Sequence, residues 1–208
     1  MARSVRKRRM VDTWKTKKWY NVLAPKMFEE VKIGETIVSS PEDLIGRTIE
    51  VSMKDIAGDF TRQHIKLKFQ IIDVRGENAY TIFRGQRLSR EYLRSQIRRK
   101  NTKVEGIVDV ITKDSHKIRI KVISLGYGRA QTSQEKRIRA LLMDMAKAFA
   151  QDKSLGQFVR DSVNGKIPSE IYRSANKIYP LKRVEIRKIK YISAVKHAVN
   201  EELATVEA

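Results

Sequence analysis

Residues 65–83 read IKLKFQIIDVRGENAYTIF, and this stretch contains the pattern on which the fold depends. From Ile65 to Val74 apolar side chains alternate with polar ones, and a period of two is typical of a strand that buries one face. Gly76-Glu77-Asn78 then supplies turn residues, and a second alternating run covers Tyr80 to Phe83. The stretch therefore predicts two antiparallel strands joined by a short turn.

Further strands are predicted on both sides of this pair. Ile49 and Val51 alternate with polar neighbours before it. After it, residues 104–111 and 117–125 alternate in the same way across a turn at Asp114-Ser115. These five strands and one inserted helix predict a β-barrel or a strongly curled antiparallel sheet over residues 41–125.

The period changes to 3.6 after the glycines at 126 and 128. Thr132 with Glu135 predicts a capping box at the start of a helix. The apolar positions of that helix lie on one face: Ile138, Leu141, Leu142, Met145 and Phe149.

Two more helices and a last strand are predicted after this helix. Ser154 with Gln157 predicts the cap of the second helix, and the third covers about 169–178, before Pro180. In the strand at 184–192 the apolar parity shifts between Ile186 and Ile189, which indicates a bulge. The predicted fold class is α+β.

The composition limits the class of protein. The chain has 208 residues, and 41% of them are hydrophobic, enough to form a folded core. The sequence contains no run long enough for a membrane span, no apolar leader and no cysteine, so we expect a soluble, unexported protein without disulfides or thiolate zinc sites. The formal net charge of +20 calls for an anionic partner.

This charge is concentrated in three blocks. Residues 1–18, 84–103 and 173–197 each hold eight basic residues and one acidic residue, so the rest of the chain is almost neutral. The first block has no apolar period and is predicted to be an extended arm. Trp14 and Trp19 lie in or beside it, and base stacking and anchoring to the fold are the two interpretations for them. Anchoring is favoured for Trp19 and Tyr20, and neither is favoured for Trp14.

The second block contains a predicted short helix over 90–99, capped by Ser89 and packed through Leu93 and Ile97. Arg90, Arg94 and Arg98 would form a row on its free side, and planar guanidinium groups suit phosphate. A solvated helix face normally mixes charges of both signs, so anion binding is the favoured interpretation. The third block has cations on both parities of the last strand, and at least one basic face there must be solvated or bound.

Enzymatic motifs are poorly represented. The histidines at 64, 116 and 197 match no metal or nucleophile pattern. Gly126-Tyr127-Gly128 begins like a dinucleotide loop, but Gln131 replaces the third glycine, and a turn from strand to helix explains the glycines better. No segment has the broad apolar face of a membrane-surface helix, and no duplex-DNA motif is present. Separate basic patches and an arm favour a folded RNA.

Several segments also resemble a known family. Residues 44–56, LIGRTIEVSMKDI, resemble the signature of the e-type S-one family (older name S-three-a), small-subunit ribosomal proteins of archaea and eukaryotes. Four other parts of the chain are similar to that family's blocks in the same order: Trp19-Tyr20 with Ala24-Pro25-Lys26-Met27-Phe28, Phe83-Arg84-Gly85 with Leu88-Ser89-Arg90, Ile178-Tyr179-Pro180-Leu181, and Ile186-Arg187-Lys188. The extension after Ile192 is short, which resembles the archaeal members.

The resemblance implies a structural, non-catalytic constituent of the small ribosomal subunit with a β-barrel core, in the cytoplasm. Its expected partners are small-subunit ribosomal RNA on the platform, neighbouring platform proteins, and messenger RNA near its exit. No cofactor, metal, membrane or small-molecule substrate is expected. A non-ribosomal nucleic-acid chaperone or chromatin protein is the alternative, and an RNA-processing enzyme is a further rival for which no convergent pocket of carboxylates or histidines can be assembled.

The predicted organisation is an arm (1–18), a single α+β domain (19–192) and a mildly acidic tail (193–208). The domain has a strand-rich part at 41–125, a helical part at 132–178 and the last strand at 184–192. The residues expected to contact RNA are Arg3, Arg6, Lys7, Arg8, Arg9, Trp14, Lys15, Lys17, Lys18, Arg84, Arg87, Arg90, Arg94, Arg98, Arg99, Lys100, Lys103, Arg129, Lys182, Arg183, Arg187, Lys188 and Lys190.

Overall fold

The computed structural model of this chain describes residues 14–194. Most of the predicted arm and of the predicted tail therefore lies outside the described residues. In the described part the elements are β1 (Lys18–Leu23), β2 (Lys32–Val38), β3 (Thr48–Ser52), α1 (Met53–Ala57), β4 (Ile65–Arg75), β5 (Asn78–Leu88), α2 (Arg90–Gln96), β6 (Lys103–Ile111), β7 (His116–Gly126), α3 (Thr132–Asp152), α4 (Leu155–Val163), α5 (Lys166–Ala175) and β8 (Leu181–Ala194).

The predicted antiparallel pair forms the centre of one half of the molecule. β4 and β5 pair from Ile65 opposite Leu88 to Arg75 opposite Asn78. The turn between them contains Gly76, whose φ of 60° is a conformation that glycine adopts without strain. β5 continues five residues beyond the predicted end at Phe83, with Arg84 as an extra residue in the ladder.

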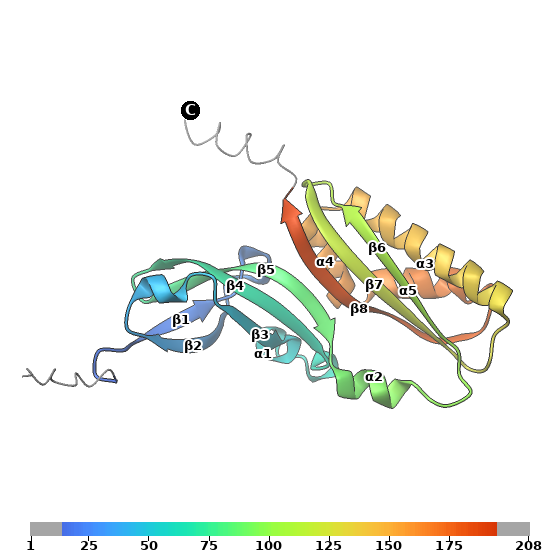
Figure 1. The fold of residues 1–208 in the computed structure, drawn as a ribbon, viewed down its shortest axis with the longest axis horizontal. Coiled ribbons are helices and arrows are strands. Elements are labelled where there is room, and N and C mark those ends of the chain that lie inside the picture. The colour runs from blue at the N-terminus through green and yellow to red at the C-terminus, as the bar shows by residue number, and fades with distance from the viewer. Residues whose placement is uncertain (1–13, 195–208) are drawn as a thin grey trace, which may run out of the picture.

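The elements group into two lobes, which lie side by side in Figure 1. We call residues 18–88, with β1–β5 and α1, the first lobe, and residues 103–194, with β6–β8 and α3–α5, the second lobe. The two are linked by α2 and by a short antiparallel contact between β5 and β8, with Gly85 opposite Lys190 and Arg87 opposite Lys188.

The predicted barrel is wrong, because the eight-stranded sheet is not closed. β5 pairs with β4 along one edge, while its other edge pairs first with β1, in parallel, and then with β8. The ladder therefore continues from the first lobe into the second, in the order β3-β4-β5-β8-β7-β6. Since β2, β3 and β6 each have one partner strand among the described residues, the sheet has open edges where a barrel would have none.

β1 and β2 were not predicted, and β1 begins inside the predicted arm, at Lys18. Its sequence KWYNVL has apolar or aromatic residues on both parities, so it shows no clear alternation. Tyr20 and Val22 are nevertheless buried in a small cluster with Val38 and Leu44. Tyr20 therefore anchors this segment as predicted.

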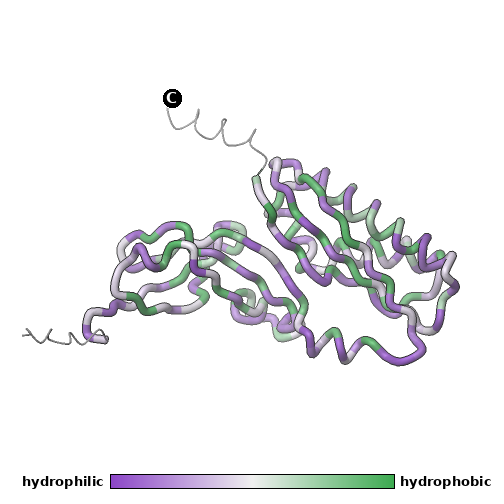
Figure 2. Tube along the Cα trace, in the orientation of Figure 1, coloured by the Kyte–Doolittle hydropathy of each residue, from purple (hydrophilic) through white to green (hydrophobic). Residues whose placement is uncertain are grey.

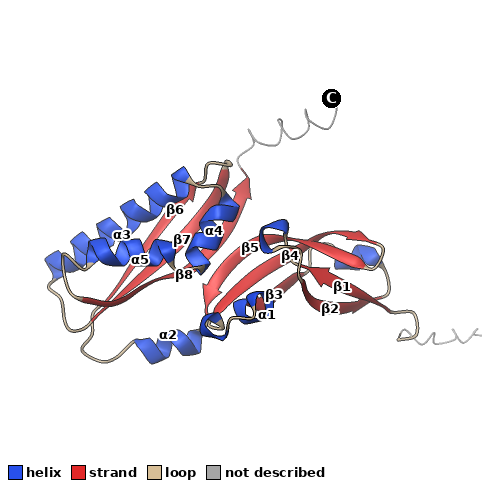
Figure 3. Ribbon diagram, turned by 180° about the vertical axis from the view of Figure 1, so that it is seen from behind, coloured by secondary structure: helices blue, strands red, loops and turns tan. Residues whose placement is uncertain are grey.

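The three predicted helices of the second lobe cover one face of β6–β8, as Figure 3 shows from behind. The first helix begins one residue earlier than predicted, because Gln131 and Gln134 form its capping box in place of Thr132 and Glu135. Its most buried positions include Ala146 and Ala150, because small side chains allow the helix close to the sheet.

α4 has the predicted capping box of Ser154 with Gln157. α5 begins three residues before the predicted start, because Gly165 is its N-cap, and it ends at Ala175. β8 runs from Leu181 to Ala194, beyond both predicted ends and into the predicted tail.

The predicted bulge of β8 is confirmed at Arg187. Ile186 lies opposite Val122 and Lys188 opposite Lys121, so Arg187 has no partner residue in β7. One large apolar cluster contains residues of both lobes, from Phe69 and Phe83 to Ile120 and Ile171. The single-domain organisation stays a prediction, which this shared cluster supports.

Candidate nucleic-acid interface

The strands of the second lobe have one apolar and one basic face. In β7, Ile118, Ile120 and Val122 are buried beneath the helices. Lys117, Arg119 and Lys121 alternate with them and therefore point to the opposite face, which α3–α5 leave open. Figure 2 shows this alternation along the strands.

Residues directly opposite each other in paired strands share a face of the sheet. The residues on the face that α3–α5 leave open therefore form two adjacent rows across six strands. The first row, from β3 to β6, is Glu50, Lys68, Gly85, Lys190, Arg119 and Asp109. The second row is Ser52, Lys66, Arg87, Lys188, Lys121 and Ile107. We call these two rows the open basic face; they hold seven cations and two carboxylates.

Only two of these cations are neutralised by acidic neighbours within residues 14–194. Arg87 forms an ion pair with Glu50, and Arg119 donates two hydrogen bonds of 2.6 and 2.7 Å to Asp109. Arg119 thereby lowers the pKa of Asp109, which stays ionised. In the described part of the chain no carboxylate lies within 4.0 Å of the five remaining ammonium groups, those of Lys66, Lys68, Lys121, Lys188 and Lys190.

A cavity of about 300 Å³ lies where β5 meets β8, in the middle of the open basic face. We call it the junction cavity. Its lining contains one carboxylate, Glu50, and five cations: Lys68, Arg84, Arg87, Lys188 and Lys190. Such a concave site with one sign of charge attracts anions more strongly than a flat surface does.

Two details of the junction cavity organise its arginines. Arg84 donates a hydrogen bond to the Gln70 side chain and lies over the Tyr191 ring, 5.3 Å from its centroid. The buried Nε of Arg87 has no hydrogen-bond partner among the described residues, although Nη2 contacts Glu50. A guanidinium group that retains unused donors suits an anionic ligand.

Gly85 determines how closely the backbones of β5 and β8 approach each other at this cavity. A Cβ atom at position 85 would lie 2.7 Å from the carbonyl oxygen of Ile189, which is backbone and cannot rotate away. The residue without a side chain therefore allows β5 and β8 to pair, and the pairing aligns the two halves of each row.

The predicted arginine row on the helix is only partly confirmed. Arg90 and Arg94 are exposed on α2, but the helix ends at Gln96, so Arg98, Arg99 and Lys100 lie in the following loop. Ile97 is 41% exposed and does not form the predicted seam.

Tyr92 anchors α2 together with Leu93. Its ring stacks on His64 with 4.0 Å between centroids, its hydroxyl donates to Glu185, and it accepts a hydrogen bond from Arg183. Burial and the hydrogen bond to Glu185 raise the pKa of Tyr92 well above its ordinary value. The hydroxyl therefore remains a donor at neutral pH.

The N-terminal site residues are placed only in part. Arg3, Arg6, Lys7, Arg8 and Arg9 lie outside the described residues. Trp14 is 63% exposed, and the ammonium group of Lys17 lies 4.6 Å from the centroid of its ring. Trp19 is 61% exposed on β1, so the prediction that it anchors the arm is wrong. Lys15 and Lys18 are exposed.

The remaining predicted cations are spread around the second lobe. Arg187 and Lys103 both contact Glu105, and Arg183 contacts Glu185. Arg129 is exposed in the loop before α3. Lys182 lies on β8 before the open basic face begins.

Sequence reasoning missed five cations of the exposed sheet surface. Lys66, Lys68, Lys117, Arg119 and Lys121 lie outside the three charge blocks. The sequence signal for these cations is their alternation with buried apolar residues: each lies next to at least one such residue in an amphipathic strand whose polar side is basic.

Neither a metal centre nor a membrane-spanning helix is found in the part of the chain that the structure describes. Residues 14–194 contain no group of three or more histidine, aspartate or glutamate side chains that could hold a metal ion. None of their helices is long and apolar enough to cross a bilayer.

The fold and this surface define a basic α+β protein with one helix-covered sheet face and one broad cationic sheet face. Comparison with known proteins gives the family: the model of the Ribosomal S3Ae family matches residues 5–194. The chain belongs to this family, and the resemblance noted in the sequence is thereby confirmed.

Curated relatives agree with this result. Small ribosomal subunit protein eS1 of Methanobrevibacter smithii is 43% identical over 193 residues, covering 93% of this chain and all of the relative. The eS1 proteins of Desulfurococcus amylolyticus and Archaeoglobus fulgidus are 44% and 41% identical, covering 87% and 93% of this chain and 85% and 92% of the relatives. These relatives are ribosomal proteins and not enzymes, as the prediction of a non-catalytic, archaeal-type protein requires.

Proposed function

We propose that this chain is a structural constituent of the small ribosomal subunit and binds ribosomal RNA through the open basic face. The observation that supports the proposal is the pair of rows across six strands, which together contain seven cations and only two carboxylates. Unbalanced charge of one sign on a continuous surface is stabilised by a polyanion.

The shape of this surface favours folded RNA. Neighbouring strands lie about 4.8 Å apart, so six strands span roughly 24 Å. Phosphates of a folded RNA can meet such a broad, twisted face at several points. The cations of α2, Arg90 and Arg94, extend the positive surface beyond the sheet.

The finer assignment rests on the family. We propose that the contact is on the platform of the subunit near the messenger exit, with neighbouring platform proteins and messenger RNA as further partners, in the cytoplasm. The names of the relatives support a ribosomal partner. The basic face supports an RNA partner.

The test measures binding of small-subunit ribosomal RNA against salt concentration. The full chain should lose affinity linearly on a logarithmic plot, and each phosphate contact removed should flatten the slope by about 0.7 to 0.9. Replacing Lys68, Lys188 and Lys190 together with alanine should therefore lower the slope by about 2 to 3. A wild-type affinity that does not change with salt contradicts the proposal.

The matched control replaces Lys136, Lys147 and Lys177 with alanine, which removes the same charge from exposed positions on or beside the helices. It should leave the slope nearly unchanged. An equal loss in both triple variants would show that only net charge matters. Equal affinity for a DNA duplex of the same length, without co-sedimentation with subunits, would support the alternative of a general nucleic-acid chaperone or chromatin protein.

A further inference from the structure

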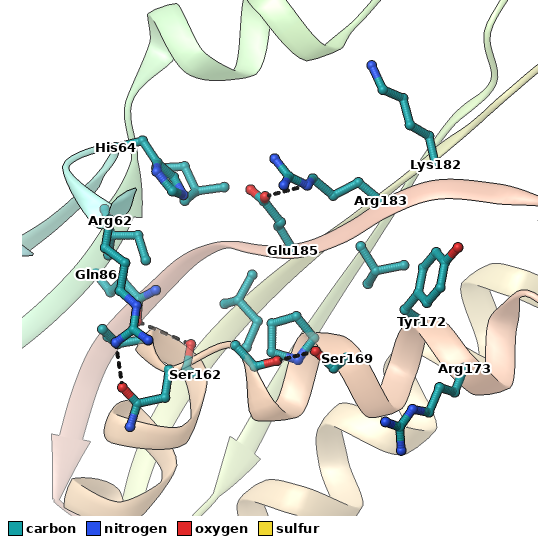
Figure 4. Close-up of a pocket in the computed structure, with 18 residues that line it drawn as sticks. Arg62, His64, Gln86, Ser162, Ser169, Tyr172, Arg173, Lys182, Arg183 and Glu185 are labelled. Atoms are coloured by element: carbon teal, nitrogen blue, oxygen red, sulfur yellow. Dashed lines mark hydrogen bonds and ion pairs between the residues drawn. The ribbon is translucent and has the colours of Figure 1, made fainter. Parts of the chain in front are cut away.

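A second cavity, of about 550 Å³, lies between the two lobes. Most of the open basic face lies on the opposite side of β5 and β8. Figure 4 shows that its walls come from the segment before β4, from β5, from the α4–α5 region and from the first half of β8. We call it the nucleotide cavity. Its volume is within the range of small-ligand sites, and the structural role of the sheet does not require it.

The walls combine apolar and aromatic surface. Ile65, Leu88 and Ile186 form part of the lining. His64 also lines it, and its ring stacks on Tyr92 at an angle of 22°. Burial lowers the pKa of His64 from its ordinary value, which favours the neutral form of the ring. This wall suits a flat, uncharged, aromatic ligand.

The cavity also contains buried hydrogen-bonding groups. Gln86 and Ser162 are each 3% exposed, and the Ser162 hydroxyl donates to Oε1 of Gln86 over 3.2 Å. This contact uses the oxygen of the amide, while the Gln86 Nε2 group donates to no acceptor in the described part of the chain. Nε2 is not among the fully enclosed side-chain atoms that lack a partner within residues 14–194, so it is accessible and can donate a hydrogen bond to a ligand in a cavity that Gln86 lines.

The rim of the cavity is basic. Arg62, Arg173, Lys182 and Arg183 line it, with Glu185 as the one carboxylate. Arg62 is held by a 2.7 Å hydrogen bond to Asn164 and an ion pair with Asp59, and Arg183 by Tyr92 and Glu185. The rim therefore favours an anionic group at the entrance of a cavity whose interior is neutral.

We propose that the nucleotide cavity binds one unstacked nucleotide of the RNA, with its base inside and its phosphate at the basic rim. Bases that leave the stack are recognised by aromatic side chains and by hydrogen bonds to their edges, and this cavity offers both. The inference rests on the proposed RNA binding. Gln86 lines both this cavity and the junction cavity, and β8 contributes residues to both linings, so the two cavities are neighbours at the junction of the lobes.

The first experiment titrates the isotopically labelled full chain with adenosine 5′-monophosphate, uridine 5′-monophosphate or ribose 5-phosphate, and follows the side-chain amide of Gln86 by NMR. The two nucleotides should shift this resonance saturably, whereas ribose 5-phosphate should leave it unchanged. Absence of a shift with both nucleotides overturns the inference. An equal shift with ribose 5-phosphate also overturns it, because the cavity would then bind phosphate alone.

The second experiment closes the entrance. Ser169 is exposed on α5 at the edge of the cavity, so Ser169→Trp should weaken nucleotide binding at least tenfold while the core stays packed. Ser133→Trp, at another exposed serine near a helix start, is the matched control and should bind like the wild type. Arg173→Glu changes one exposed rim residue and should weaken nucleotide binding several-fold even if the tryptophan variant folds poorly.

The same variants separate this inference from the proposed function. If wild-type chain binds ribosomal RNA without salt dependence but nucleotides still shift Gln86, the proposed function fails and the cavity remains a nucleotide site. If Ser169→Trp and Arg173→Glu bind ribosomal RNA as tightly as Ser133→Trp does, with an unchanged salt slope, the cavity receives no nucleotide of that RNA and the inference is overturned.

Discussion

The two faces of β7 belong to the same strand but have different functions. Ile118, Ile120 and Val122 are at most 2% exposed beneath the helices. Lys117, Arg119 and Lys121 point to the face opposite α3–α5, where Arg119 has a carboxylate partner. Burial of the first set stabilises the fold, because apolar area is removed from water.

The second set contributes little to stability, since exposed cations gain little from their neighbours and repel one another. A folded state with several unpaired cations on one face is strained electrostatically until a polyanion binds. The comparison therefore assigns stability to one face and binding to the other, and single substitutions on adjacent residues can test this division.

The largest difference is expected between Ile120→Ala and Lys121→Ala. Ile120 is 0% exposed, and truncation of such an isoleucine lowers the free energy of unfolding by about 2–5 kcal/mol. Lys121→Ala should change it by less than about 0.5 kcal/mol but should flatten the salt dependence of RNA binding by about 0.7 to 0.9. Urea denaturation and salt-dependent binding measure the two effects.

The assignment of stability to one face and of binding to the other is contradicted if Lys121→Ala destabilises the chain as much as Ile120→Ala does. It is also contradicted if folded Ile120→Ala shows a flatter salt slope than Lys121→Ala. Arg119→Ala is a stricter test of the same assignment, because this substitution also leaves the Asp109 carboxylate without its hydrogen-bond donor.

Much of the fold followed from local patterns in the sequence. The β4–β5 pair, the α4 capping box and the bulge near Arg187 depend on residues close together in the chain, and all three were predicted. Whether the sheet closes into a barrel does not depend on residues close together in the chain. It depends on which strand pairs with the second half of β5, and the partner, β8, comes about 100 residues later.

The site divides in a similar way. Runs of cations such as Arg187-Lys188 were visible as charge blocks, whereas Lys66 and Lys121 were recognised only when the register placed them beside Arg87 and Lys188. Arg98 was assigned to a helix face by periodicity, but the helix ends at Gln96, before that position. The backbone becomes extended at Ile97, and no glycine or proline marks this helix end in the sequence.

An intermediate effect is expected from Gly85→Ala, which tests whether the basic face must be continuous between lobes. The new Cβ would lie 2.7 Å from the Ile189 carbonyl oxygen, so β5 and β8 must separate. The free energy of unfolding should fall by about 1–3 kcal/mol, the usual range for overpacking. RNA affinity should also fall at salt concentrations where the variant is folded, because the rows lose their alignment.

Gly34→Ala is the matched control for this experiment. Gly34 also lies in a strand and does not have a positive φ, but nothing lies within 4 Å of a Cβ built there. It should retain both stability and RNA affinity. Gly85→Ala with normal RNA affinity would show that the two lobes contribute independently to binding.

The smallest effect concerns the place where α2 covers part of the otherwise open face. His64 stacks on Tyr92, with Glu185 and Arg183 nearby; burial lowers the pKa of His64, and Arg183 acts in the same direction, while Glu185 opposes it. Because the unfolded chain takes up a proton at His64 more readily than the folded chain, stability should decrease as the pH falls below about 6.5. His64→Phe keeps an aromatic ring on Tyr92 and should reduce this decrease. Urea midpoints at pH 7.5 and 5.5 measure it, and equal losses for both chains would show that neutral His64 does not help to hold α2 against the sheet.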